Sequence, residues 1–239
     1  MENDLKHLRV TIGISACLVG QRVRYDGDHK RFNRLLERLS HQVDWKPFCP
    51  EVEAGLGTPR PPVQLIENNK TIRALGVENK ALDVTDQLQE ASIDYWSQQA
   101  RHRHVSGYIF KARSPSCGRG STPVVDHEQH ILHHGDGIFA SHCQRNIAAV
   151  EDTWFQSDAH FVRFLAASHV ARAIQRETFA SITWLSEYLE GAPSEHWIAQ
   201  LLDRSIDEYG TFDGEVSGDK EQKAALVKRL FEIWPVDLA

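Results

Sequence analysis

The sequence predicts an α/β fold: a parallel-sheet amino-terminal domain with three cysteines at strand ends, followed by a carboxy-terminal α-helical extension. Short β-branched and aromatic runs that end in turn-forming residues predict the strands, and apolar residues at helical spacing between those runs predict the helices. Strands that alternate with helices indicate a parallel sheet, whose ligands bind outside the carboxyl ends of the strands. We place the first domain at residues 8–153 and the extension at residues 154–239.

Each of the three predicted strands leads toward a cysteine. The strands are expected at residues 10–14, 43–48 and 107–111, and they precede Cys17, Cys49 and Cys117 respectively. Such runs, followed by Gly, Pro and charged residues, are typical of a strand that feeds a loop. Because the carboxyl ends of parallel strands meet at one edge of a sheet, we expect the three cysteines to converge on one rim.

Two amphipathic helices are predicted between these strands. Residues 28–39 carry apolar side chains at i, i+3, i+4 and i+7, namely Phe32, Leu35, Leu36 and Leu39. A second helix begins near Asp83 or Thr85, either of which could cap it, and runs to about Gln99. Between the two, the proline-rich segment 58–62 cannot be helical. We interpret it as a rigid wall over the site, with a surface linker as the alternative.

The carboxy-terminal extension has a different, aromatic-rich composition. Apolar residues at helical spacing predict helices near residues 161–169, 179–188, 197–206 and 222–234, which together would form a small bundle. Aromatic stripes at this spacing are typical of a packed core. The extension could complete the core, cap the site or form a dimer interface, so a homodimer is among the expected assemblies.

The number and spacing of the cysteines restrict the kinds of site that they can form. The chain has 4 Cys in 239 residues and no C-x-x-C pair, which argues against a disulfide framework and against a zinc ribbon or finger. The amino terminus is charged and has no apolar core, so we expect the reducing cytoplasm. Cys143 is interpreted as structural, because Phe139, Cys143 and Ile147 recur every fourth residue on one helical face.

Charge and histidine content exclude other classes of function. The formal net charge of −6 argues against bulk nucleic-acid binding, and we see no transmembrane run, so no membrane partner is expected. Arginines and lysines gather in the cysteine loops, where they could balance a negative metal site or bind an anionic substrate. The His-rich stretches 101–104 and 127–134 are interpreted as solvated, the latter as a hairpin, rather than as metal ligands.

Several motifs of the first domain resemble those of the DUF523 family, which includes the thiouracil desulfidases. They fall in order at residues 14–20, 23–27, 48–51, 58–62, 83–85 and 111–118. The resemblance implies a [4Fe-4S] cluster held by Cys17, Cys49 and Cys117, with the fourth iron open to the sulfur of a thiolated pyrimidine such as 2-thiouracil. Some members carry a second helical domain, DUF1722, whose motifs the extension here does not match.

The same resemblance implies an enzyme that releases sulfide from its substrate, with a hydrolytic outcome and no net redox change. It places a catalytic carboxylate at Glu51 and a hydroxyl at Ser114; the alternatives are a salt bridge for Glu51 and a turn cap for Ser114. The predicted substrate-binding residues are Arg24, Tyr25, Arg60, Lys111 and Ser116. A non-catalytic iron–sulfur sensor or sulfur-delivery module is the alternative function, and a zinc-bound structural protein is a third.

Overall fold

The computed structural model describes residues 9–102, 105–143, 147–158, 160–161, 164–165, 167–168 and 171–172. Its strands are β1 (Val10–Ser15), β2 (Val43–Phe48), β3 (Val63–Asn68), β4 (Thr71–Gly76), β5 (Gly107–Phe110), β6 (Thr122–Val125), β7 (Ile131–Gly135) and β8 (Ala148–Glu151). Its α-helices are α1 (Asn33–Leu39), α2 (Pro50–Glu53), α3 (Thr85–His102) and α4 (Ile138–Ser141), and its 3-10 helices are η2 (Ala16–Val19) and η3 (Asp152–Trp154).

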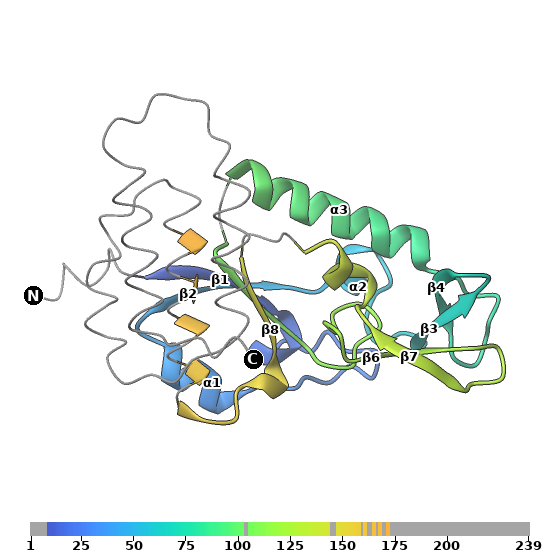
Figure 1. Ribbon diagram of the computed structural model, residues 1–239, viewed down its shortest axis with the longest axis horizontal. Helices are drawn as coiled ribbons and strands as arrows, with labels where there is room; N and C mark the ends of the chain where they lie inside the picture. The colour runs from blue at the N-terminus through green and yellow to red at the C-terminus, as the bar shows by residue number, and fades with distance from the viewer. Residues whose placement is uncertain are drawn as a thin grey trace, which may run out of the picture.

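The first sheet is parallel throughout and has the strand order β2-β1-β5-β8. This confirms the predicted α/β class with a parallel sheet. Val10 pairs with Val43 at one end of β1 and Ser15 with Phe48 at the other, while Ile12 pairs with Gly107 of β5. The carboxyl ends of four neighbouring strands therefore lie side by side, and the loops that follow them share one edge of the sheet (Figure 1).

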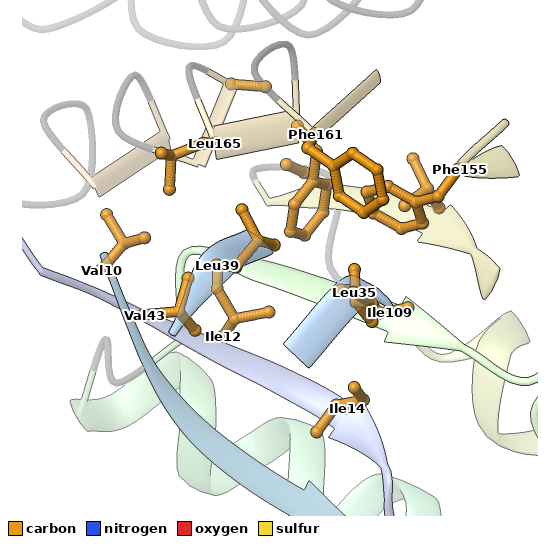
Figure 2. Close-up of a cluster of buried hydrophobic side chains, with 14 of the residues drawn as sticks. Val10, Ile12, Ile14, Leu35, Leu39, Val43, Ile109, Phe155, Phe161 and Leu165 are labelled. Atoms are coloured by element: carbon orange, nitrogen blue, oxygen red, sulfur yellow. The ribbon is translucent and has the colours of Figure 1, made fainter. Parts of the chain in front are cut away.

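Successive residues of β1 point to opposite faces of this sheet, and each face packs against a hydrophobic cluster. Ile12 and Ile14 face a fully aliphatic and aromatic layer that includes Leu35 and Leu39 of α1. Figure 2 shows Phe155, Phe161 and Leu165 closing this layer from the side opposite the strands. The described residues of the predicted extension, up to residue 172, thus complete the core of the sheet; the helices expected at 179–188, 197–206 and 222–234 lie outside the described residues.

The opposite face of the sheet carries a second core made largely of aromatic rings. Tyr108 and Phe110 of β5 point into it, and α3 and α4 cover it; its other rings are Phe48, Tyr95, Trp96 and Phe139. Gly13 of β1 makes this packing possible, because a Cβ at that position would lie 2.3 Å from Cδ2 of Tyr108. The ring of Tyr108 therefore lies directly on the backbone of β1.

A second sheet, which the sequence analysis did not predict, has the order β4-β3-β6-β7. Two antiparallel hairpins, β3–β4 and β6–β7, join through a parallel pairing of β3 with β6. Leu65, Ala74 and Val124 of this sheet pack on Val84 and Leu88, at the start of α3. Helix α3 begins beside this sheet and extends toward the first one, so it connects the two (Figure 1).

Most predicted elements are present, with some changes at their ends. The first helix begins at Asn33 rather than near residue 28, because the N–H groups of Lys30 and Phe32 donate to the carbonyls of Cys17 and Leu18 and hold that stretch outside the helix. Leu35 and Leu39 nevertheless form the predicted buried face.

The second predicted helix begins at Thr85, one of the two predicted starts, and continues to His102. Residues 126–134 form the exposed β6–β7 hairpin, as predicted. The helical prediction around Cys143 is wrong in extent: α4 ends at Ser141, before that cysteine. In the part of the chain that the structure describes, no helix combines the length and the apolar character needed to cross a membrane.

Candidate metal centre

The three predicted ligand cysteines follow three adjacent strands of the parallel sheet. Cys17 lies in η2, directly after β1; Cys49 lies directly after β2 and before α2; Cys117 lies in the loop that follows β5. Cys17 and Cys117 are 8% and 6% exposed, and Cys49 is partly buried. The structure therefore brings all three to the same edge of the sheet.

Burial and mutual repulsion oppose ionisation of these thiols. Burial, and after it the nearby Cys49, raise the pKa of Cys17 to about 11, while Lys111 and Arg24 act in the opposite direction. Burial also raises the pKa of Cys49, and raises that of Cys117 well above its ordinary value, with Cys49 as the next cause. The thiols sense one another electrostatically, and a metal that binds their thiolate forms must displace protons.

Hydrogen-bond donors act on two of the three sulfurs. The hydroxyl of Ser15 bonds to the sulfur of Cys117, which favours the thiolate. Ser15 Oγ also accepts the N–H of Lys111 at 2.9 Å, so this residue connects β1 to the start of the Cys117 loop. The backbone N–H groups of Glu51 and Val52 bond to the sulfur of Cys49. Donors of this kind are a usual accompaniment of metal-bound sulfur.

Glu51 is held by two residues that the sequence analysis had assigned to substrate binding. Arg60 Nε donates to Oε2 at 2.7 Å, Nη2 of the same guanidinium forms an ion pair with Oε2 at 2.5 Å, and the hydroxyl of Ser116 donates to Oε1 at 2.8 Å. The side chains of Arg60 and Glu51 are 5% and 12% exposed, and Ser116 is fully buried. The carboxylate of Glu51 thus has a fixed position one residue after Pro50 and two after Cys49.

Arg60 also joins the proline-rich segment to the cysteine loops. Its Nη2 donates to the carbonyl of Val23 at 2.9 Å, and its backbone N–H donates to the carbonyl of Tyr25. Segment 58–62 is non-helical, as predicted, and contains a cis bond between Thr58 and Pro59. The segment therefore lies against both Glu51 and the loop that follows Cys17.

Ser114 performs the turn-capping function given as the alternative in the sequence analysis. Its Oγ accepts the N–H groups of Ser116 and Cys117, at 3.3 and 3.1 Å. Its carbonyl accepts the N–H of Gly118 and the hydroxyl of Thr122. Ser114 thereby shapes the turn that presents Cys117, and its own hydroxyl proton is left to donate elsewhere.

Two acidic residues that the sequence analysis missed secure the Cys117 loop. Asp152, just after β8, accepts Lys111 Nζ at 2.9 Å and the N–H of Ala112 at 2.7 Å. Glu151 accepts the N–H of Arg119 at 2.6 Å and the hydroxyl of Ser121 at 2.5 Å. In the sequence, these two residues stand at the end of the apolar run 147–150, a pattern that predicts a strand. Most of this run lies in β8, which pairs with β5.

The remaining predicted substrate-binding residues, Arg24, Tyr25 and Lys111, lie beside Cys17 or on the loop after it. Arg24 pairs with Asp26 at 3.3 Å and lies over the ring of Tyr25, while its Nε is buried without a hydrogen-bond partner. Tyr25 is among the exposed large apolar side chains. Lys111 is engaged with Asp152, so its charge faces Cys17 from a fixed position.

Other titratable clusters lie away from this edge. Cys143 packs against the aromatic core, and burial raises its pKa to about 12. Among the described residues, Asp126, Glu128 and His130 have ligand atoms within 4.8 Å of one another, but they form the exposed turn of the β6–β7 hairpin, where Asp126 accepts the N–H groups of the other two. These side chains are accounted for by the turn itself.

A model of the 2-thiouracil desulfurase family matches residues 12–153. The chain belongs to this family. The match begins in β1 and ends in η3, so it includes the three cysteines, Glu51 and its partners, and the acidic residues that hold the Cys117 loop. The resemblance found in the sequence motifs is thereby confirmed.

Two proteins illustrate what the chain is similar to. The uncharacterized protein YbbK of Bacillus subtilis (strain 168) is 32% identical over 116 residues, which are 45% of this chain and 72% of that protein. A solved structure, that of the [4Fe-4S]-dependent thiouracil desulfidase TudS, is 28% identical, with a TM-score of 0.49 over 62% of this chain and 93% of the other.

Proposed function

We propose that this protein removes sulfur from a thiolated pyrimidine resembling 2-thiouracil, using a [4Fe-4S] cluster held by Cys17, Cys49 and Cys117. The observation that carries the proposal is the gathering of three thiols at the ends of three adjacent parallel strands in a chain of the 2-thiouracil desulfurase family. The overall reaction would exchange a thiocarbonyl and water for a carbonyl and hydrogen sulfide, with no net change of oxidation state.

The donor set fits an iron–sulfur cluster. Thiolates are soft ligands that suit such clusters, and Arg24 and Lys111 supply positive charge beside Cys17.

When bound through three cysteines, a four-iron cluster would supply a Lewis-acid position for the sulfur of the substrate. The other requirements of the reaction fall to the protein's own side chains. A water molecule that attacks the thiocarbonyl carbon must lose both of its protons in the course of the reaction, and the departing sulfur must gain two to leave as hydrogen sulfide. A positioned carboxylate beside the cysteines can accept these protons and return them one at a time.

Glu51 is the side chain best placed for this proton transfer. Its Oε2 is occupied by Arg60 and its Oε1 takes one hydrogen bond from Ser116, which leaves further lone pairs on Oε1 to accept a proton from water. Arg60 and Ser116 would then act as positioning residues, because they fix the carboxylate without needing to touch substrate. Ser114, whose hydroxyl proton is not used within the turn, can donate to the polar edge of the pyrimidine.

Arg24 and Tyr25 are the residues we assign to the rim of the substrate site. Tyr25 offers an exposed aromatic face, and the buried Nε of Arg24 is a donor without a protein acceptor. A pyrimidine ring has both a stackable face and carbonyl or anionic acceptors, so it matches this pair. Lys111, held by Asp152, contributes positive charge toward the cysteines.

The test is anaerobic reconstitution with iron and sulfide, followed by iron and acid-labile sulfide counts and a 2-thiouracil turnover assay on the same sample. We expect about four irons per chain, with conversion to uracil and release of sulfide. Replacement of Cys117 by Ser should abolish iron loading, whereas Cys143→Ser should retain it. A loaded cluster without turnover on thiouracil or its nucleosides would favour the non-catalytic sensor or sulfur-delivery function, and absence of iron would refute the ligand assignment.

A further inference from the structure

Two tyrosine hydroxyls in the aromatic core have no hydrogen-bond partner. The Oη atoms of Tyr95 and Tyr108 are both buried and unpaired, and Tyr108 as a whole is fully buried. A buried polar group without a partner costs about 1–3 kcal/mol. Phenylalanine at either position would avoid this cost, so the presence of a buried hydroxyl there calls for a functional explanation.

The residues packed around Tyr108 provide no hydrogen-bond acceptor for its hydroxyl and leave the ring no room to rotate. Its ring packs against Phe110 at 4.4 Å, Phe139 at 5.3 Å and Trp96 at 5.5 Å between centroids. On the strand side the ring lies against Gly13, where even a Cβ would approach to 2.3 Å. The packing therefore fixes the direction of the hydroxyl, because rotation of the side chain would meet either backbone or another ring.

The two tyrosine hydroxyls differ in which thiols lie near enough to act on them electrostatically. Besides Tyr95, the groups that act electrostatically on the Tyr108 hydroxyl are the thiols of Cys117, Cys49 and, more weakly, Cys143. Tyr95 is influenced in the same way by Cys143 alone. Cys117 also shares the hydrophobic cluster that contains Tyr108. The Tyr108 hydroxyl therefore lies close enough to two of the three proposed ligands to interact with them electrostatically, and Tyr108 packs in one buried cluster with the first of them, Cys117. For Tyr95, only Cys143 acts in this way.

We propose that the Tyr108 hydroxyl donates a hydrogen bond to a sulfur atom of the bound iron–sulfur cluster. The inference rests on the cluster of the proposed function. It adds a hydrogen-bond donor from the aromatic core to the donors already described, Ser15 and the backbone amides of α2. A hydrogen bond to cluster sulfur withdraws electron density from the irons. It stabilises the reduced cluster and makes an open iron a stronger acceptor for the substrate sulfur. Tyr108 is therefore a tuning residue, not a catalytic one.

The experiment compares the reconstituted wild-type protein with Tyr108→Phe and Tyr95→Phe. The two variants remove chemically identical hydroxyls from the same core, so Tyr95→Phe is the matched control. After iron and sulfide have been counted, the midpoint potential of the one-electron reduction is measured by a titration followed by electron paramagnetic resonance. We expect a more negative potential for Tyr108→Phe and the wild-type value for Tyr95→Phe.

A further protein with 3-fluorotyrosine at position 108 keeps the side chain's shape while making the hydroxyl a stronger donor. Its potential should shift in the positive direction, opposite to that of Tyr108→Phe, and it provides the test if the phenylalanine variant does not fold. An unchanged potential in the Tyr108 proteins, or an equal shift in Tyr95→Phe, would overturn this inference while leaving the cluster in place. Failure of the wild-type protein to hold any cluster would overturn both proposals.

Discussion

Replacement of Glu51 by Gln removes one charge from the metal centre and almost no volume. In the wild-type protein one carboxylate oxygen accepts the Nε–H of Arg60 and forms an ion pair with its guanidinium, and the other accepts the hydroxyl of Ser116. Glutamine can keep this arrangement, with its oxygen toward Arg60 and its amide toward the Ser116 oxygen. The variant therefore isolates the charge and the proton-accepting ability of Glu51 from its shape.

The cost of this change follows from those contacts. Hydrogen bonds to a charged partner are worth about 1.5–3 kcal/mol and neutral ones about 0.5–1.5 kcal/mol. Weakening the buried Arg60 interaction from the first kind to the second should lower the free energy of unfolding by about 1 kcal/mol, less than the roughly 3–5 kcal/mol expected when a buried pair loses one partner entirely. If Glu51 transfers the proton, turnover should also fall at least about tenfold, which corresponds to roughly 1.4 kcal/mol in the activation barrier.

The assay pairs three measurements on the same anaerobic sample: iron content, the visible absorption of the cluster and the rate of 2-thiouracil conversion. Glu53→Gln is the control, because Glu53 is an exposed carboxylate on the same helix. We expect Glu51→Gln to keep the wild-type iron content and spectrum, and Glu53→Gln to keep full turnover as well. Wild-type turnover in Glu51→Gln, with an intact cluster, would refute the role of Glu51 in the chemistry.

Three further predictions concern the scaffold and are checked by urea denaturation of the metal-free protein. Ser15→Ala leaves the partly buried N–H of Lys111 without its acceptor and should cost about 1 kcal/mol; an unchanged midpoint would contradict this. Gly13→Ala forces the Tyr108 ring to move and should cost about 1–3 kcal/mol; wild-type stability would show that the ring yields freely. Because folding raises the pKa of Cys143 from 9.0 to about 12, the contribution of this thiol to stability should be fully present below about pH 9 and be lost as the pH rises toward 12, a loss that Cys143→Ala should reduce.

The parallel sheet and the gathering of the cysteines were predictable because both follow from local signals. Short β-branched runs form strands, and parallel strands place their following loops at one edge, so Cys17, Cys49 and Cys117 needed no knowledge of side-chain contacts. The starting residue of α3 was predictable for a similar reason: Asp83 Oδ1 accepts the N–H of Thr85, a local capping interaction.

What sequence reasoning did not find depends on partners far apart in the chain. The second sheet pairs β3 with β6 across more than fifty residues, and its short strands are individually ambiguous. The fixation of Glu51 requires Arg60, nine positions away, and Ser116, 65 positions away. The role of Asp152 requires β8 beside β5. Such contacts appear only when the tertiary structure brings the segments together.

The distribution of the cysteines over three strands has a consequence for how the protein is made. The second and third proposed ligands come 32 and then 68 positions after the one before, and no stretch of chain shorter than residues 17–117 contains all of them. A nascent chain therefore cannot collect iron as it leaves the ribosome in the way that a run of closely spaced cysteines can. The three proposed ligands come together only where β1, β2 and β5 pair, so in the proposed function the folded apoprotein is the species that an iron–sulfur donor would recognise.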